Sequence, residues 1–427
     1  MKKHTFLQGV HPSDKKDLTE NKAIEKMPVS SDYFISLSQH IGAPAAPIVN
    51  QGDNVAQGQL IAKANGKISA NIFSSVSGTV VEILKRKNAQ NTAVDYIHVK
   101  AEGDNKVALP KMEKIDKESI LQRIFDAGIV GLGGAGFSTA VKDSPNKPVD
   151  ILLINAAECE PYLNCDNRLM IEHIDEVLDG ISLMATAIGV EKVIIGIEDN
   201  KMTAYEKLSN SGYEIKLLKK KYPQGAEKVL IYTCTKRRVP NKGGLPMDVG
   251  VVVHNVATAY AVYDAVRNNN PLYKRVLTVS GKGINDPKNL WVLNGTLHKD
   301  IFEFCGGVND NAVKLISGGP MMGFPLNNAD CSTTKAESGL LALTEDEINL
   351  LQPTNCISCG RCAAVCPMHL MPMYIDFYIQ SDDLDSAVKY GAMDCFECGC
   401  CSFICPAKRS LVQSVRLAKQ KMRERKK

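Results

Sequence analysis

Eight cysteines near the C-terminus fall into two runs with identical spacing. The first run has the pattern C-x2-C-x2-C-x3-C-P, and the second run repeats it. Three thiolates this close together in the chain can wrap three corners of one cubic [4Fe–4S] centre, and the fourth cysteine of each run then reaches the other centre. One predicted cluster is therefore held by Cys356, Cys359, Cys362 and Cys405, and the other by Cys366, Cys395, Cys398 and Cys401.

Zinc is the main alternative metal for these cysteines. Structural zinc sites usually draw four ligands from two pairs, and a doubled run of this kind does not offer that arrangement. Cys400 lies beside Cys401, outside the repeated spacing, and is predicted to be a spare thiol. The scattered cysteines are predicted to be small core residues, and they are Cys159, Cys165, Cys234, Cys305 and Cys331.

A glycine-rich loop at residues 131–137, with the sequence GLGGAGF, is a second candidate for chemistry. Its spacing satisfies G-x-G-x-x-G, but residues 120–127 before it have the apolar pattern of a helix rather than a strand. The loop therefore lacks the context of a dinucleotide-binding βαβ turn. Such a loop lets the backbone approach a phosphate or a flat ring closely. The alternative is a tight loop that serves packing alone.

Two acidic residues, Glu158 and Glu160, follow an apolar run at residues 150–155 and precede Pro161. That run has the length and the β-branched character of a strand. In α/β domains, sites form at the carboxyl ends of strands. We therefore expect both carboxylates to be functional and Glu160 to be catalytic, with solvated loop residues as the alternative.

The elements that must position these residues form several modules. Residues 48–83 contain short strands separated by glycines, in a pattern that resembles the barrel-sandwich hybrid of lipoyl and biotinyl domains. Lys63 and Lys67 lack the sequence context of a lysine that carries such a group, so this module is predicted to be structural. Residues from about 115 to 265 alternate apolar strands with helical patterns, which predicts a largely parallel sheet. The short strands after residue 270 resemble a soluble-ligand-binding β-grasp (SLBB) module.

The predicted fold class is α/β multi-domain, with a Rossmann-like central domain. An N-terminal arm is predicted at residues 1–30 and a barrel-sandwich hybrid at 31–105. An α/β domain follows at 110–268 and an SLBB β-grasp at 270–325. The last module, at 340–427, is predicted to be a helical ferredoxin-type domain with two [4Fe–4S] clusters and a basic tail.

Composition and charge restrict the possible partners. The net charge is +4, but nine Lys or Arg residues and one acid fall between Lys408 and Lys427, so the rest of the chain is mildly acidic. No nucleic-acid binding is expected. The basic tail is either a solvated helix end or a contact for anionic lipid or an acidic partner. No apolar run is long enough for a transmembrane helix and no signal peptide is apparent, so a cytoplasmic protein with reduced thiols is predicted.

The glycine loop, Thr139 and Lys142, followed by the run at residues 155–161, resemble the flavin site of the NADH-oxidising subunit of respiratory complex I and related hydrogenases. The chain is more similar still to the RnfC family, the C component of the Rnf ion-translocating oxidoreductase complex. Members of that family share GLGGAGF and the run AECEPYL…D.RLM, which here covers residues 157–170. The order of the modules also fits, and the similarity extends over nearly the whole chain.

This resemblance implies that the domain at 110–268 binds FMN non-covalently, with NADH stacking on the flavin. Residues near the flavin phosphate and ribityl chain would then be Gly131, Gly133, Gly134 and Lys142. Two residues are expected to hydrogen-bond the flavin, Asn155 and Glu158. Further flavin or nucleotide contacts are expected from Phe137, Tyr222, Gly225, Glu227, Asn255 and Thr258. Glu227 is also, with Glu160, a predicted catalytic residue.

The chain departs from the complex I pattern at four positions. Complex I has Arg, Asp, Glu and Glu where this chain has Leu132, Ala157, Ala226 and Ala257. These departures remove polar groups that would contact the nucleotide. A preference for NADH over NADPH therefore rests on the resemblance alone.

The function that the resemblance implies is that of a peripheral, NADH-oxidising subunit of a membrane-bound NAD:ferredoxin oxidoreductase, at the cytoplasmic face of the bacterial cell membrane. Electrons from NADH would pass through FMN and two [4Fe–4S] clusters to or from ferredoxin, coupled to Na⁺ or H⁺ transport. Its partners would be a ferredoxin-like iron–sulfur subunit and integral membrane subunits. Two alternatives stay open: a cobalamin reductase of a bacterial microcompartment, and a non-catalytic electron-relay subunit.

Overall fold

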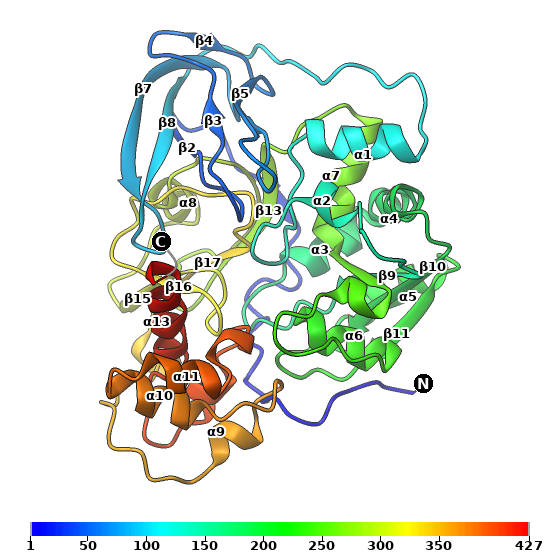
Figure 1. Cartoon of the computed structure of the whole chain (residues 1–427). Coiled ribbons are helices and arrows are strands. Elements are labelled where there is room, and N and C mark those ends of the chain that lie inside the picture. The colour runs from blue at the N-terminus through cyan, green and yellow to red at the C-terminus, as the bar shows by residue number, and fades with distance from the viewer. Residues whose placement is uncertain (1, 426–427) are drawn as a thin grey trace.

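The computed structural model describes residues 2–425 and shows four modules (Figure 1). A β module lies at the top of the view beside the α/β domain, with a β-grasp unit below it and a helical C-terminal domain at the bottom. The N-terminal segment, drawn in blue, runs between the α/β domain and the C-terminal domain. Within residues 2–425, no helix has both the length and the apolar character needed to cross a bilayer.

The N-terminal β module has two small sheets, with strand orders β2-β8-β7-β4 and β3-β5-β6. Apolar side chains such as Ile35, Ile61 and Ile97 are fully buried in one core. Alternate residues of a strand point to opposite faces, so each sheet has one face that contributes to this core. The strands are β2 (Asp32–Ser36), β3 (Ala46–Pro47), β4 (Asn54–Val55), β5 (Leu60–Lys63), β6 (Ile72–Phe73), β7 (Gly78–Lys87) and β8 (Ala93–Ala101).

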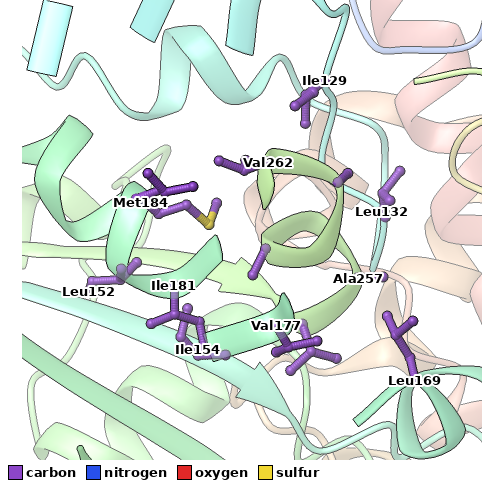
Figure 2. Close-up of a cluster of buried hydrophobic side chains, with 14 of the residues drawn as sticks. Ile129, Leu132, Leu152, Ile154, Leu169, Val177, Ile181, Met184, Ala257 and Val262 are labelled. Atoms are coloured by element: carbon purple, nitrogen blue, oxygen red, sulfur yellow. The ribbon is translucent and has the colours of Figure 1, made fainter. Parts of the chain in front are cut away.

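The α/β domain has a four-stranded parallel sheet in the order β11-β10-β9-β12. Both faces of this sheet are covered by helices. Leu152 and Ile154 point to one face, against helices α4 and α7 (Figure 2), whereas Ile151 and Leu153 point to the other. This explains the continuous apolar runs in the sequence. The strands are β9 (Ile151–Ala156), β10 (Lys192–Glu198), β11 (Glu214–Leu218) and β12 (Val251–Asn255).

The helices of this domain connect the parallel strands. An Asp116 capping box starts α1, and Gly189 ends α4 in the left-handed conformation. The Asn255 side chain accepts the Ala257 amide and caps α7. The helices are α1 (Lys117–Asp126), α2 (Thr139–Lys142), α3 (Cys165–Glu172), α4 (Ile174–Ile188), α5 (Met202–Ser209), α6 (Glu227–Thr235), the 3₁₀ helix η1 (Pro246–Val249) and α7 (Val256–Arg267).

The β-grasp unit is a six-stranded sheet with helix α8 (His298–Phe304). Its order is β1-β14-β13-β17-β15-β16, and its edge strand β1 comes from the N-terminal arm. Residues 1–30 were predicted only as an arm, without a strand, so β1 was not foreseen. The strands are β1 (Ile24–Lys26), β13 (Lys274–Ser280), β14 (Lys288–Leu293), β15 (Ala312–Ser317), β16 (Phe324–Leu326) and β17 (Gly339–Thr344).

The C-terminal domain is helical and contains an internal repeat. Each feature of the first cysteine run recurs 39 residues later, from Cys356 to Cys395 onward. The repeat extends to the backbone, because left-handed residues occur at matching places, Ser358, Gly360 and His369 in one half and Glu397, Gly399 and Lys408 in the other. The helices are η2 (Glu345–Glu347), α9 (Arg361–Ala364), α10 (Pro372–Gln380), α11 (Leu384–Lys389), η3 (Ala392–Asp394), α12 (Cys400–Ile404) and α13 (Leu411–Glu424).

The basic tail forms most of helix α13. Lys419 pairs with Glu397, Lys421 with Asp382, and Arg425 with Asp385 at 2.6 Å. These partners belong to the same domain, so part of the tail's charge is used within the fold. The last two predicted tail residues, Lys426 and Lys427, lie outside the described residues. The fold class predicted from the sequence, α/β with several modules, is confirmed.

Candidate functional site

The predicted flavin residues gather at the carboxyl ends of β9 and β12. Strand β9 is flanked by β10 on one side and by β12 on the other. The chain passes from β9 to β10 and β11 on one side of β9 and then returns through α6 to β12 on the other side. The strand order therefore reverses beside β9, and such a switch point opens a crevice at the strand ends. β9 ends at Ala156 and β12 ends at Asn255, which places Asn155, Glu158 and Asn255 at this edge.

The glycine loop lies against the same edge. The Leu132 amide donates a hydrogen bond to Thr258 Oγ1 at 3.0 Å. The Gly131 amide donates to the carbonyl of Phe137 at 2.9 Å, which closes the loop, and Phe137 is partly buried. A Cβ on Gly133 would lie 2.6 Å from Asn255 Nδ2, so glycine is required there.

The outer side of this loop is open. Gly133 and Gly134 are both exposed, and a Cβ on Gly134 would meet nothing within 4 Å. Bare, accessible backbone beside a sheet crevice is a suitable surface for a phosphate or a flat ring. The loop therefore has the properties that a flavin site needs.

A second close approach joins β9 to the segment before α6. Asn155 Nδ2 donates a hydrogen bond to the Gly225 carbonyl at 2.9 Å, and Asn155 Oδ1 accepts the Ala157 amide at 3.1 Å. A Cβ on Gly225 would lie 3.3 Å from Asn155 Oδ1. The asparagine thus fixes the segment that leads into Glu227, the first residue of α6.

Lys142 and Glu227 form an ion pair across the open side of the site. The distance from Lys142 Nζ to Glu227 Oε1 is 2.6 Å, and their side chains are 26% and 40% exposed. A pair with this exposure adds little to stability. The ion pair instead holds the Lys142 ammonium at the open side of the site. There the flexible lysine side chain can bind a phosphate.

Both carboxylate oxygens of Glu158 accept hydrogen bonds from backbone amides in the first turn of α3. Its Oε1 accepts the Asp166 amide at 2.7 Å, and its Oε2 accepts the Asn167 amide at 3.1 Å. Asp166 in turn accepts Asn255 Nδ2 at 2.6 Å, and burial raises the pKa of Asp166 to about 7. Asp166 was not predicted as a site residue. The available signal was its place in the run shared with the Rnf family.

Glu160 and Tyr222 lie on the side of the α/β domain that faces the C-terminal domain. The Glu160 carboxylate accepts the amides of Met321 and Met322 at 3.1 and 3.0 Å. The Tyr222 hydroxyl lies 3.3 Å from Glu160 Oε1 and 2.8 Å from the Cys398 carbonyl oxygen. Burial raises the pKa of Glu160 to about 7. The catalytic role of Glu160 stays a prediction, and its contacts connect three modules.

One pocket in the C-terminal domain is lined by cysteines from both runs. We call it site one, and its cysteines are Cys356, Cys359, Cys362 and Cys405. Met373 and Leu411 provide apolar walls, and no carboxylate lines the pocket. The four cysteines are those predicted to share one cluster.

The other four cysteines form a second group, which we call site two. Burial and the neighbouring thiols of Cys395, Cys398 and Cys366 raise the pKa of Cys401. Metal binding requires the thiolate form and removes such protons. The thiols of Cys366, Cys395 and Cys398 thus lie near that of Cys401. These four cysteines are the set predicted to share the other cluster, and that assignment stays a prediction.

Backbone amides point at the sulfurs in both sites. The Ser358 amide lies 3.5 Å from Cys356 Sγ, and the equivalent Glu397 amide lies 3.3 Å from Cys395 Sγ. The Leu370 amide lies 3.4 Å from Cys366 Sγ. Amide donors stabilise negative charge on sulfur and tune cluster potentials. The residues present fit iron–sulfur clusters, although the ligand assignments remain predictions.

Comparison with protein families matches each module in turn. The description "RnfC Barrel sandwich hybrid domain" matches residues 4–104, and "Nuo51 FMN-binding domain" matches residues 124–264. "SLBB domain" matches residues 276–325, and "4Fe-4S dicluster domain" matches residues 348–406. The chain therefore contains an FMN-binding domain and an iron–sulfur dicluster domain.

Curated relatives match over almost the whole chain. The C component of a proton-translocating ferredoxin:NAD(+) oxidoreductase complex from Clostridium ljungdahlii is 46% identical, over 98% of this chain and 94% of the relative. The C component of an ion-translocating oxidoreductase complex from Rhodobacter capsulatus is 45% identical, over 98% and 83%. The C component of a Na(+)-translocating ferredoxin:NAD(+) oxidoreductase complex from Acetobacterium woodii is 42% identical, over 99% and 98%.

Among solved structures, an NAD+-reducing [NiFe]-hydrogenase in its H2-reduced state is similar with a TM-score of 0.45 at 20% identity. The match covers 65% of this chain and 53% of the hydrogenase chain. The same hydrogenase in its air-oxidized state gives the same values.

Proposed function

Because the chain belongs to the RnfC family of ion-translocating oxidoreductase complexes, we propose that it is the NADH-oxidising subunit of such a complex. Its partners are then the ferredoxin-like iron–sulfur subunit and the integral membrane subunits. A peripheral position at the cytoplasmic face of the bacterial cell membrane follows from this role. The coupling ion, Na⁺ or H⁺, differs between the relatives and is left open.

We propose that FMN lies at the switch point of the α/β sheet. The bare backbone of the glycine loop and Lys142 would hold its phosphate and ribityl chain, and Asn155 is placed to position the segment on the opposite side. Glu158 and Asn255 hold the start of α3 and α7 in place around it. The remaining proposed contacts come from Phe137, Tyr222, Gly225, Glu227 and Thr258.

The chemistry that bound FMN supplies is acceptance of a hydride from NADH, a two-electron step, and release of single electrons, of which each [4Fe–4S] centre carries one. The residues supply position and charge. Glu227 neutralises Lys142 until an anionic group binds, and it is the residue we propose to act next to the reacting nucleotide. Site one and site two would hold the two clusters.

The observation that carries this proposal is the direct connection between the modules. A sheet crevice with an open glycine loop lies in the same fold as two four-cysteine sites, and Tyr222 contacts the backbone of Cys398. A flavin domain alone would have no resident one-electron centre to receive the electrons that the flavin releases singly. The adjoining thiol sites give it one-electron outlets.

The test is spectroscopic. Anaerobically purified chain should contain one flavin and eight iron atoms, and NADH should bleach the flavin absorbance and generate cluster EPR signals. Protein with zinc in place of iron, or flavin that NADH does not bleach, would contradict the proposal. Glu227→Gln should slow bleaching by NADH while dithionite still bleaches the flavin fully.

A non-catalytic electron-relay role is the second candidate, and one observation favours it. Leu132, Ala157 and Ala257 stand where complex I has polar residues, and all three are buried in apolar surroundings. They offer no polar side-chain atom to a nucleotide. Under this alternative Glu227→Gln leaves the rate of NADH oxidation unchanged, which separates the two candidates.

A further inference from the structure

The part of the C-terminal domain that holds the cysteines, residues 351–425, is attached to the rest of the chain at one side only. Among residues 2–425, the hydrogen bonds that cross this boundary end on residues around site two or on Arg416. The bonds of Asp346 and Glu347 to Lys282 and Tyr162 lie before this boundary. The Gly9 amide donates to the Val365 carbonyl at 2.9 Å, next to Cys366. The Lys242 amide donates to Asp394 Oδ1 at 2.7 Å, next to Cys395.

Tyr222 makes the most direct of these contacts. Its side chain is 1% exposed, and its hydroxyl lies 2.8 Å from the carbonyl oxygen of Cys398, a predicted cluster ligand. Its backbone makes two hydrogen bonds with Val10. The Val10 amide donates to the Tyr222 carbonyl at 2.8 Å, and the Tyr222 amide donates to the Val10 carbonyl at 3.0 Å. The next residues of the same segment are Gly225 and Glu227 of the flavin site. One short segment thus connects the flavin site to site two.

A second connection runs through Glu160. Its carboxylate holds the amides of Met321 and Met322, and a Cβ on Gly319 would lie 2.2 Å from Glu160 Oε2. The Met321 carbonyl lies so close to Gly399 that a Cβ there would approach it to 2.6 Å. The loop that Glu160 fixes is therefore in contact with the backbone between Cys398 and Cys401.

Charged groups extend this connection around site two. Arg416 donates to the Met322 carbonyl at 3.2 Å and to Glu397 Oε2 at 3.1 Å. Lys419 lies 2.7 Å from Glu397 Oε1 and donates to the Cys395 carbonyl at 2.5 Å. The backbone of site two is thus held by residues of three modules.

Site one has different surroundings. Residues 351–359, which include Cys356 and Cys359, are all exposed, and the Ile357 side chain is 66% exposed. In the described part of the chain, the Thr354 amide donates to Ala407 and Arg409 donates to the Thr354 carbonyl, both within the domain. No described hydrogen bond joins residues 351–362 to another module.

We infer that Tyr222 and Glu160 lock site two onto the flavin-binding domain, so that site two exchanges electrons with the flavin side and site one exchanges them with a partner. This inference rests on the proposed function and adds the order of the two sites and two positioning residues. NADH becomes NAD⁺ by losing one hydride, which carries two electrons and one proton. The proton is released to solvent, and the sites pass the two electrons singly, site two before site one in this direction. The partner's own one-electron centre is the acceptor.

Hydrogen exchange tests the lock in the iron-loaded full chain. Tyr222→Phe removes one hydroxyl and the bond to Cys398, so amides of residues 396–401 should exchange about fivefold faster. Amides of residues 357–362 in site one should be unchanged. The matched control is Tyr374→Phe, which removes a hydroxyl from a residue on α10 that is 42% exposed. Equal changes in both sites, or none in either, would overturn the inference.

EPR spectroscopy tests the order. In Cys356→Ser, the site two signal should appear when NADH is added. In Cys398→Ser, the site one signal should be lost with NADH and present with dithionite. The reverse pattern, or the same response in both variants, would overturn the order. If neither variant assembles a cluster, the exchange comparison decides. Failure of the proposed function looks different, because NADH would then not bleach the flavin of the unaltered protein.

Discussion

Site one and site two are built from the same local structure, yet their surroundings are opposite. Left-handed backbone occurs at the same places in both cysteine runs, so the chain makes the same turns around each set of thiols. Site one opens into a pocket beside an exposed segment, whereas residues 394–401 of site two are buried or partly buried. The repeated turns determine how each set of cysteines is arranged. The contacts that each site makes with other modules determine which electron donor or acceptor lies next to it.

The side chains at equivalent positions explain this difference. Ile357 in site one is exposed, and its equivalent Phe396 packs with Val10 and Tyr222. Arg361 is exposed, whereas its equivalent Cys400 is 1% exposed in the same apolar cluster. A long charged side chain at position 400 would be buried in this apolar cluster without an opposite charge beside it. Cys400 was predicted to be a spare thiol, and that role stays a prediction; the residue is buried at the domain boundary, where an arginine would not fit.

Exchanging these two equivalent residues gives the largest expected effect. Cys400→Arg should lower the free energy of unfolding by about 3 kcal/mol or more, because an unpaired charge is then buried beside Tyr222. The reciprocal change, Arg361→Cys, should alter stability by less than about 0.5 kcal/mol at its exposed position. Anaerobic denaturant unfolding measures both. Similar losses in the two variants would show that the sites do not differ in the way we describe.

The two sites should also differ in the rate at which they lose iron, because solvent reaches site one more easily. We expect this effect to be smaller than the previous one. With a strong iron chelator in anaerobic buffer, iron should leave in two phases. The half of the iron bound in site one should be lost at least about tenfold faster than the half in site two. Site one is exposed and can open without breaking the contacts at the domain boundary. The absorbance of the iron–chelator complex follows the release. EPR of the half-depleted protein should retain the site two signal. A single phase would contradict the asymmetry.

Much of this architecture was predictable from sequence, because it depends on short-range patterns. The doubled cysteine run predicted two mixed sets of four thiols. In the structure the first set lines one pocket and the thiols of the second set lie near one another, and their role as cluster ligands stays a prediction. The apolar runs predicted the parallel sheet at residues 150–255. Both signals come from residues that are close in the chain or from a strict period.

The attachment between modules was not predictable, since it depends on pairs far apart in the chain. Tyr222 was predicted to contact the flavin or nucleotide from its place in a motif, but nothing in the motif indicates that its hydroxyl meets residue Cys398. Glu160 was predicted to be catalytic, and no local pattern indicates that Met321 and Met322 donate to it. Strand β1 in the arm has only three residues, too few to show a period.

Titration of Glu160 tests only the contacts that hold site two, because no described hydrogen bond joins this residue to site one. Burial raises the pKa of Glu160 from its ordinary 4.5 to about 7, so between these pH values the folded state binds more protons at this residue than the unfolded state. Its contribution to the free energy of unfolding must then fall as pH rises from 4.5 to about 7, and stay constant above. Glu160→Gln should remove this dependence. The measurement is the difference in unfolding free energy between the two proteins at several pH values, in which Asp166 and Glu198 cancel because both proteins keep them.

The smallest expected effect concerns charge at the position two residues after the first cysteine of each run. Site two has Glu397 there, paired with Arg416 and Lys419, and site one has Ser358. Glu397→Gln removes a negative charge and leaves both cations beside the thiolates, which favours the reduced cluster. The midpoint potential of site two should rise by roughly 30 mV, and that of site one should shift by much less, because the charge is screened over the longer distance. Ser358→Ala is the matched control and should leave both potentials unchanged in an EPR-monitored redox titration. A shift confined to site one would mean that Glu397 acts on the other cluster, and it would remove the electrostatic part of the difference between the two sites.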